Sequence, residues 1–129
     1  SEDAEFSEVI AGLSISLSAR PSADTARLAV DLRHAANAAA ARGVEHELLK
    51  VLELAMLLMR KHQPPSVIGK LAVVKALQSL AGSSGATEDL LSRILREFQN
   101  APWGLRSLPL SSQFERVLSV IASSVALTP

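Results

Sequence analysis

The sequence predicts an all-α domain, and three observations lead to that prediction. Leucine and alanine, both strong helix formers, are the most frequent residues. Aromatic residues, which strands favour, make up only 3% of the chain. Apolar residues recur at spacings of three and four through six segments, which are separated by proline, glycine or capping residues. A length of 129 residues fits a single domain.

The first helix is predicted over residues 3–19 and ends before Pro21, because proline cannot continue the helical hydrogen-bond ladder. Its apolar residues follow a helical stripe from Phe6 to Leu17. Residues 13–18 also alternate with a period of two, so a strand is the alternative there. We favour the helix, because no other segment would pair with an isolated strand.

The second helix is predicted to have Ser22 as its N-cap and Asp24 in its first turn, and to end at Arg42 before Gly43. Its inner face is rich in alanine, which predicts that a neighbouring helix approaches closely. The third helix, residues 44–62, is apolar around most of its circumference. That pattern is typical of a helix at the centre of a fold.

A double proline separates the third helix from a fourth, which is predicted over residues 67–81 with Ser66 as its N-cap. Thr87 is the predicted N-cap of a fifth helix, which Asn100 and Pro102 are predicted to end. The connection between them, residues 82–85, reads Gly-Ser-Ser-Gly and is predicted to be a flexible loop.

The sixth helix is predicted to begin with a capping box, in which Ser112 caps the helix and Glu115 reaches back to it. Short connections predict antiparallel neighbours, and two architectures fit. One is a six-helix orthogonal or up-down bundle, and the other is a short stack of helical hairpins as in helical-repeat proteins. No internal sequence repeat is evident. We expect residues 1–129 to form one domain excised from a larger protein, because the initiator methionine is absent.

Several classes of site are excluded by composition. The chain has no cysteine, which excludes disulfides, zinc ribbons, iron–sulfur ligation and a thiol nucleophile. The longest apolar run, residues 54–59, is far shorter than the roughly 20 residues that span a bilayer. We therefore expect no membrane insertion and an intracellular location, in the cytoplasm or nucleus.

No motif for catalysis, a cofactor or a metal is recognisable. The three histidines, His34, His46 and His62, lack metal-ligand spacing and are predicted to lie on the surface or at its rim. His62 is predicted to cap the C-terminus of the third helix, where the helix dipole favours it. The serines include no Gly-x-Ser-x-Gly elbow, and residues 82–85 lack the lysine of a phosphate-binding loop. We therefore predict that the protein is not an enzyme and binds no cofactor.

Charge is distributed unevenly along a chain of zero net charge. Residues 1–59 carry a net charge of −4 and residues 60–129 a net charge of +4. Such halves would give the molecule a dipole that steers a partner or favours head-to-tail association, unless folding interleaves them.

The strongest functional expectation comes from the number of apolar residues, which is larger than a buried core would need. Trp103, Leu105, Leu108 and Leu110 form a leucine-rich stretch between the last two helices, and tryptophan is enriched at interface hot spots. The alternative for Trp103 is a plug over the end of the core. We predict a non-catalytic scaffold or adaptor module for protein–protein interaction, which binds a partner helix or a second copy through an aliphatic groove.

The alternative function is a nucleic-acid-associated helical domain. It would use a basic cluster in the second half of the chain, formed by Arg60, Lys61, Lys70 and Lys75.

Overall fold

A computed structural model describes residues 2–19, 24–62, 66–100 and 110–126, and every regular element in them is helical. The all-α class is confirmed, and residues 13–18 are helical. The elements are α1 (Glu2–Ser18), α2 (Thr25–Arg42), α3 (Glu45–Leu57) with a π-helical turn (Leu58–His62), α4 (Val67–Ala81), α5 (Glu88–Gln99) and α6 (Ser112–Ala126).

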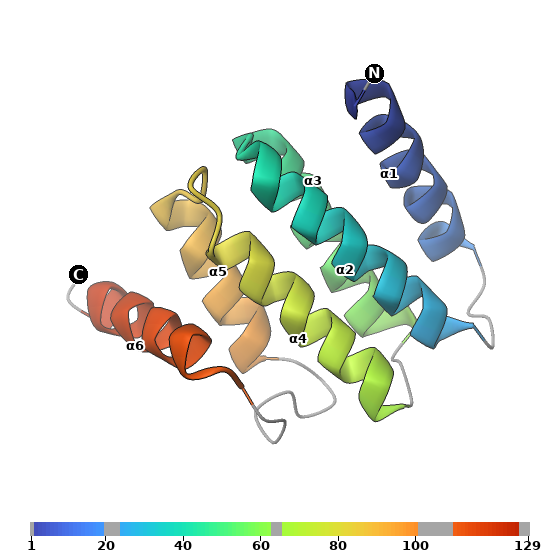
Figure 1. The fold of residues 1–129 in the computed structure, drawn as a ribbon. Coiled ribbons are helices and arrows are strands. Elements are labelled where there is room, and N and C mark those ends of the chain that lie inside the picture. The colour runs from blue at the N-terminus through green and yellow to red at the C-terminus, as the bar shows by residue number, and fades with distance from the viewer. Residues whose placement is uncertain (1, 20–23, 63–65, 101–109, 127–129) are drawn as a thin grey trace.

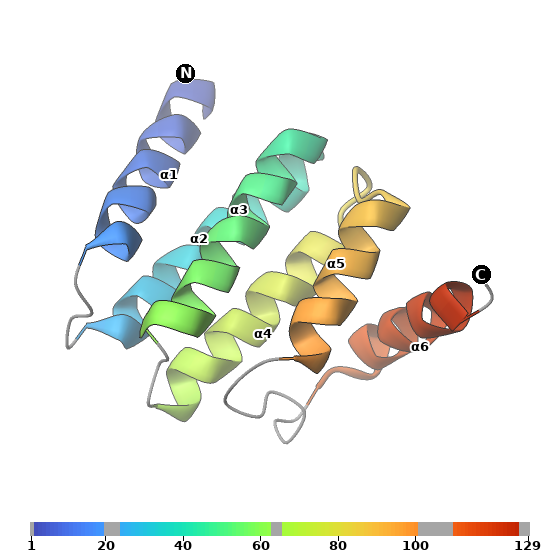
Figure 2. The ribbon, with the colours of Figure 1, turned by 180° about the vertical axis from the view of Figure 1, so that it is seen from behind.

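The four middle helices form two layers. Helices α2 and α4 lie side by side in one layer and run in the same direction (Figure 1). Helices α3 and α5 return in the other layer, which faces the viewer in Figure 2. The α2–α3 hairpin is therefore stacked on the α4–α5 hairpin, with α1 and α6 at opposite ends (Figure 1). Of the two predicted architectures, the arrangement is the stack of helical hairpins.

The two hairpins stack so that residues of α2 and α4 about 42 positions apart in the sequence lie side by side. The Ser79 hydroxyl donates to Asn37 Oδ1 over 2.5 Å, across a separation of 42 residues. The Ser83 hydroxyl donates to the Ala40 carbonyl over 2.9 Å, across 43 residues. Periods of about 40–47 residues are typical of two-helix repeats. The separation between the residues that α2 and α4 bring together lies close to that range.

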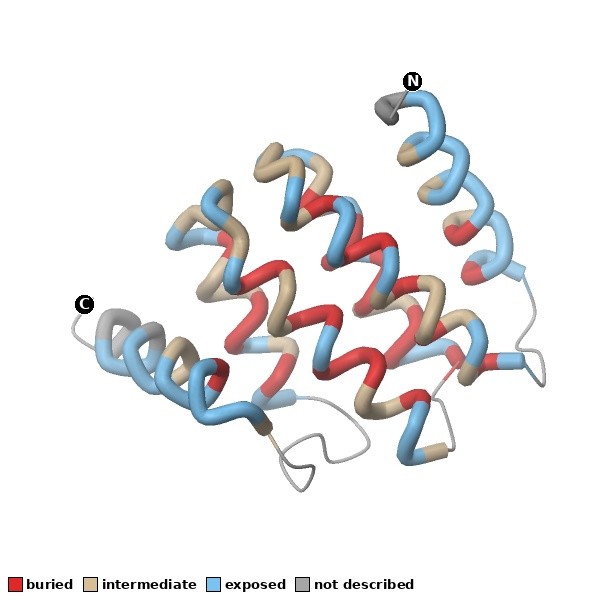
Figure 3. The backbone as a smooth tube through the Cα atoms, in the orientation of Figure 1, coloured by how far each residue is buried: buried red, intermediate tan, exposed pale blue. Residues whose placement is uncertain are grey.

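The core lies between the two layers (Figure 3). Three alanines of α2, Ala35, Ala36 and Ala39, are buried there, and α2 makes its most extensive contact with α4. The predicted close approach to the alanine face is therefore confirmed. The end helices contribute less: α1 buries Leu13 and Leu17, whereas α6 buries Phe114 among its described side chains.

Local capping follows the sequence prediction at α4 and α5. Ser66 Oγ accepts a hydrogen bond from the Gly69 N–H over 3.0 Å, and Thr87 Oγ1 accepts one from the Leu90 N–H over 3.2 Å. Gly43 ends α2 in the left-handed conformation, at a φ of 67°.

The predicted starts of two other helices are wrong. Helix α6 is capped by Ser111, whose Oγ accepts a hydrogen bond from the Phe114 N–H over 3.2 Å, so Ser112 already lies inside the helix. The capping box is lost, because the residue three positions after Ser111 is not glutamate. Asp24 occupies the N-cap position of α2 instead of its first turn, and Ser22 lies outside the described residues.

The Gly-Ser-Ser-Gly connection is docked, contrary to its prediction as a flexible loop. Gly85 lies directly against Gly43, so closely that a Cβ on Gly85 would overlap the Gly43 carbonyl. The Ser83 hydroxyl adds its hydrogen bond to the end of α2. The turn of one hairpin therefore rests on the turn of the next, and both glycines are needed for that approach.

The prediction of a surface position is wrong for one of the three histidines. His62 is 5% exposed, and its Nε2 lies 2.9 Å from the carbonyl of Leu17. Since a carbonyl only accepts, Nε2 carries the proton, and the buried Nδ1 has no hydrogen-bond partner among the described residues. Lys61 donates to the neighbouring Ser18 carbonyl over 2.7 Å. The two side chains together hold the C-terminal end of α1, where helical carbonyls lack intrahelical partners.

Candidate protein-interaction site

A mainly apolar hollow lies between the first two helices. We call it the α1–α2 groove, and it encloses about 400 Å³. Its walls are formed by Phe6 and Val9 of α1 and by Ala35, Ala38 and Ala41 of α2. The groove exists because α1 is anchored through its C-terminal half, by Leu13 and Leu17, and because the facing side chains of α2 are short.

One rim of the α1–α2 groove carries an acidic side chain, and the other rim carries basic side chains. Glu5 lies on the α1 side, and His34 and Arg42 lie on the α2 side. The Arg42 guanidinium sits 5.3 Å from the centre of the Phe6 ring and pairs with Glu47 over 2.6 Å. These contacts fix one end of the groove. Val9 remains 47% exposed, which is a large fraction for an apolar residue on its wall.

A second surface lies on the other side of α2, and we call it the α2–α4 trough. It consists of two adjoining hollows of about 340 and 280 Å³, which share Asn37, Gln78 and Ser79. Arg33 and Lys75 line the larger hollow from α2 and α4. The trough therefore follows the contact between the two hairpins.

Of the predicted leucine-rich contact surface, the structure places one residue. Leu110 is half-buried and lines the α2–α4 trough. Trp103, Leu105 and Leu108 lie outside the described residues, so their role as contacts stays a prediction.

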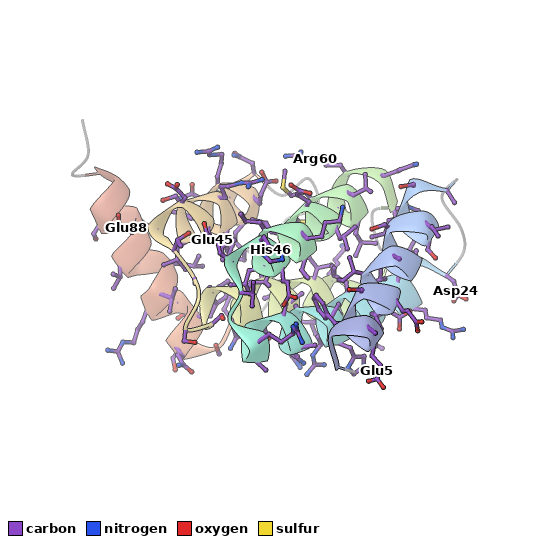
Figure 4. The ribbon with its side chains drawn as sticks, turned by 90° about the horizontal axis from the view of Figure 1, so that it is seen from above. Glu5, Asp24, Glu45, His46, Arg60 and Glu88 are labelled. Atoms are coloured by element: carbon purple, nitrogen blue, oxygen red, sulfur yellow. The ribbon has the colours of Figure 1, made fainter. Side chains whose placement is uncertain are left out.

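The predicted basic residues occupy different environments. The Arg60 guanidinium donates to Glu97 of α5 over 2.8 Å, on the α3–α5 layer (Figure 4). Lys61 is bound to the Ser18 carbonyl at the end of α1. Lys70 and Lys75 belong to α4 in the other layer, where Lys75 reaches the trough. Two of the four are thus engaged within the chain.

The sequence analysis missed Arg33 and Asn37 as surface residues of interest. Each has an equivalent 42 residues later, in Lys75 and Ser79. A weak sequence signal exists for this equivalence, because both hairpin turns read glycine, three residues, an acid and two leucines (43–49 and 85–91). Aligning these two turns would have placed the cations in register.

In the described part of the chain, no group of three or more histidine or acidic side chains gathers where it could hold a metal ion. Among the same residues, no helix combines the length and apolar character needed to cross a membrane.

The architecture is that of proteins built from stacked helical hairpins. No protein-family model, curated protein or solved structure matches this chain.

Proposed function

We propose that this chain is a non-catalytic protein-interaction module, and that its α1–α2 groove joins two copies of it. The observation that carries the proposal is the apolar groove, in which an exposed valine faces a row of alanines. Burying a valine side chain contributes about 1.5–3 kcal/mol. Alanines allow the helix of a second molecule to approach closely, because they protrude little from α2.

The charges of the rims favour a second copy as the occupant. Helix α1 carries four acidic residues and no basic one, whereas the α2 rim carries Arg42 and His34. A two-fold axis along the groove would place the α1 rim of each copy against the α2 rim of the other. Glu5 would then face the α2 rim of the other copy twice, as an isologous interface requires, and would share the Arg42 guanidinium with Glu47. A helix from a different protein is the alternative occupant.

Sedimentation equilibrium across a range of protein concentration tests this proposal. We expect a monomer–dimer equilibrium that follows mass action. Val9→Glu should shift the protein to monomer, since it places a second negative charge beside Glu5 on the apolar wall. Ile68→Glu is the matched control: Ile68 is 70% exposed at the start of α4, outside the groove lining, and its substitution should leave the dimer intact.

A wild-type protein that remains monomeric throughout would reject the second copy as occupant. Equal weakening by Val9→Glu and Ile68→Glu would show that association does not use the groove.

A further inference from the structure

We propose that the α2–α4 trough binds an acidic segment of a partner protein. This surface is separate from the α1–α2 groove, because α2 lies between the two (Figure 1).

Both hairpins contribute the same kinds of side chain to the α2–α4 trough. Arg33 and Lys75 occupy equivalent positions 42 residues apart, and so do Asn37 and Ser79. Within each helix the cation precedes the polar residue by four positions, which places both on one face of the helix. All four side chains line the same hollow. Each hairpin therefore supplies one cation and one hydrogen-bonding side chain to a common surface.

The side chains that line the α2–α4 trough carry a net positive charge. Within the part of the chain that the structure describes, the trough lining contains no aspartate or glutamate. Arg33 and Lys75 form no ion pair there, whereas Arg42 and Arg60 are each paired with a glutamate. Cations without an internal counter-ion, placed around a hollow, are complementary to an anionic ligand.

The remaining lining favours a peptide over a nucleic acid. Leu71 and Leu110, both partly exposed, provide apolar contacts in the same hollow, which suit aliphatic side chains. Gln78 and the amide of Asn37 offer donors for main-chain carbonyls of a ligand. Two cations are few for a phosphate backbone, and Phe114, the aromatic residue that the described part of the lining contains, is 1% exposed and unavailable for base stacking.

A selection from a random peptide library displayed on phage, against the immobilised full chain, tests the proposal. We expect enrichment of peptides that combine acidic and aliphatic residues. Their affinity for the Arg33→Gln/Lys75→Gln variant should fall at least about tenfold, and added salt should weaken binding to the wild type. The matched control is Lys50→Gln/Arg96→Gln, which removes the same two charges from exposed positions of the other layer and should bind as the wild type does.

A selection that enriches no acidic peptides would overturn the proposal, and so would equal peptide affinity for the wild type and the Arg33→Gln/Lys75→Gln variant. A third contradicting outcome is that a single-stranded oligonucleotide displaces the peptide from the wild type and that its own binding requires Arg33 and Lys75. The last outcome would assign the trough to nucleic acid. The Val9→Glu variant should bind the selected peptides normally, so the dimer and the trough are tested independently.

Discussion

The contact of Gly43 with Gly85 shows how single residues set the spacing of the two hairpins. The left-handed φ of 67° at Gly43 ends α2, and the absence of a side chain at Gly85 lets the next turn approach the Gly43 carbonyl. Both conditions depend on backbone geometry that only glycine tolerates easily. The two hairpin turns are therefore expected to be sensitive to a single added methyl group.

Gly85→Ala should lower the free energy of unfolding by about 1–3 kcal/mol, since the new Cβ would overlap backbone that cannot move without shifting a whole turn. Urea denaturation measures the change. Gly82→Ala is the control in the same connection: the nearest atom to its added Cβ lies 3.4 Å away, and its stability should change by less than about 0.5 kcal/mol. Equal effects of the two substitutions would contradict the docked turn.

Residue-level features were predictable where their causes are local. Ser66 and Thr87 cap amides that lie three residues away, so the sequence pattern contains both partners. His62 is different, because its partner, the Leu17 carbonyl, lies 45 residues away on another helix. No local pattern reports such a contact.

At the scale of elements, the sequence predicts each helix with small errors at the ends. The period of the apolar residues and the positions of proline and glycine are local signals, so α4 is predicted with its observed bounds, Val67–Ala81. Helix α6 shows the limit of such signals. Two adjacent serines are both good caps, and only the structure distinguishes Ser111 from Ser112.

The two serines at the start of α6 give a direct comparison. Ser111→Ala should reduce stability by about 1 kcal/mol, because the Phe114 N–H loses its acceptor at the helix start. Ser112→Ala should have little effect, since Ser112 is exposed in the first turn and alanine is a good helix former. Thermal unfolding of the two variants measures this difference. A larger loss of stability for Ser112→Ala than for Ser111→Ala would instead support the predicted capping box at Ser112.

At the scale of the whole molecule, the sequence left the architecture open for a physical reason. A helical stripe shows which face is buried, but it does not show which helix covers it. The most extensive contact joins α2 and α4, which are parallel and not consecutive, and short connections predict only the antiparallel neighbours. The sequence likeness that points to this contact lies in residues 43–49 and 85–91, which join the helices of each hairpin and begin α3 and α5.

The candidate surfaces could be predicted only in part, for the same reason. An aliphatic groove was expected at the third and fourth helices and at the leucine-rich stretch around Trp103, whereas the apolar groove described above lies between α1 and α2. The trough likewise depends on the register between α2 and α4. The residue types therefore predict that apolar and charged surfaces exist. Where these surfaces lie depends on how the helices stack, which the sequence does not show.

Intramolecular cross-linking of cysteine pairs tests the stacking of equivalent hairpins most directly, because the native chain contains no cysteine. Asn37→Cys/Ser79→Cys replaces two side chains that contact each other in the structure, and a short bismaleimide should link them in the monomer. Ser16→Cys/Ser119→Cys places the pair on α1 and α6, at opposite ends of the molecule, and should give no intramolecular link (Figure 1). Failure of the first pair to cross-link, or efficient cross-linking of the second within one chain, would contradict the stacked arrangement.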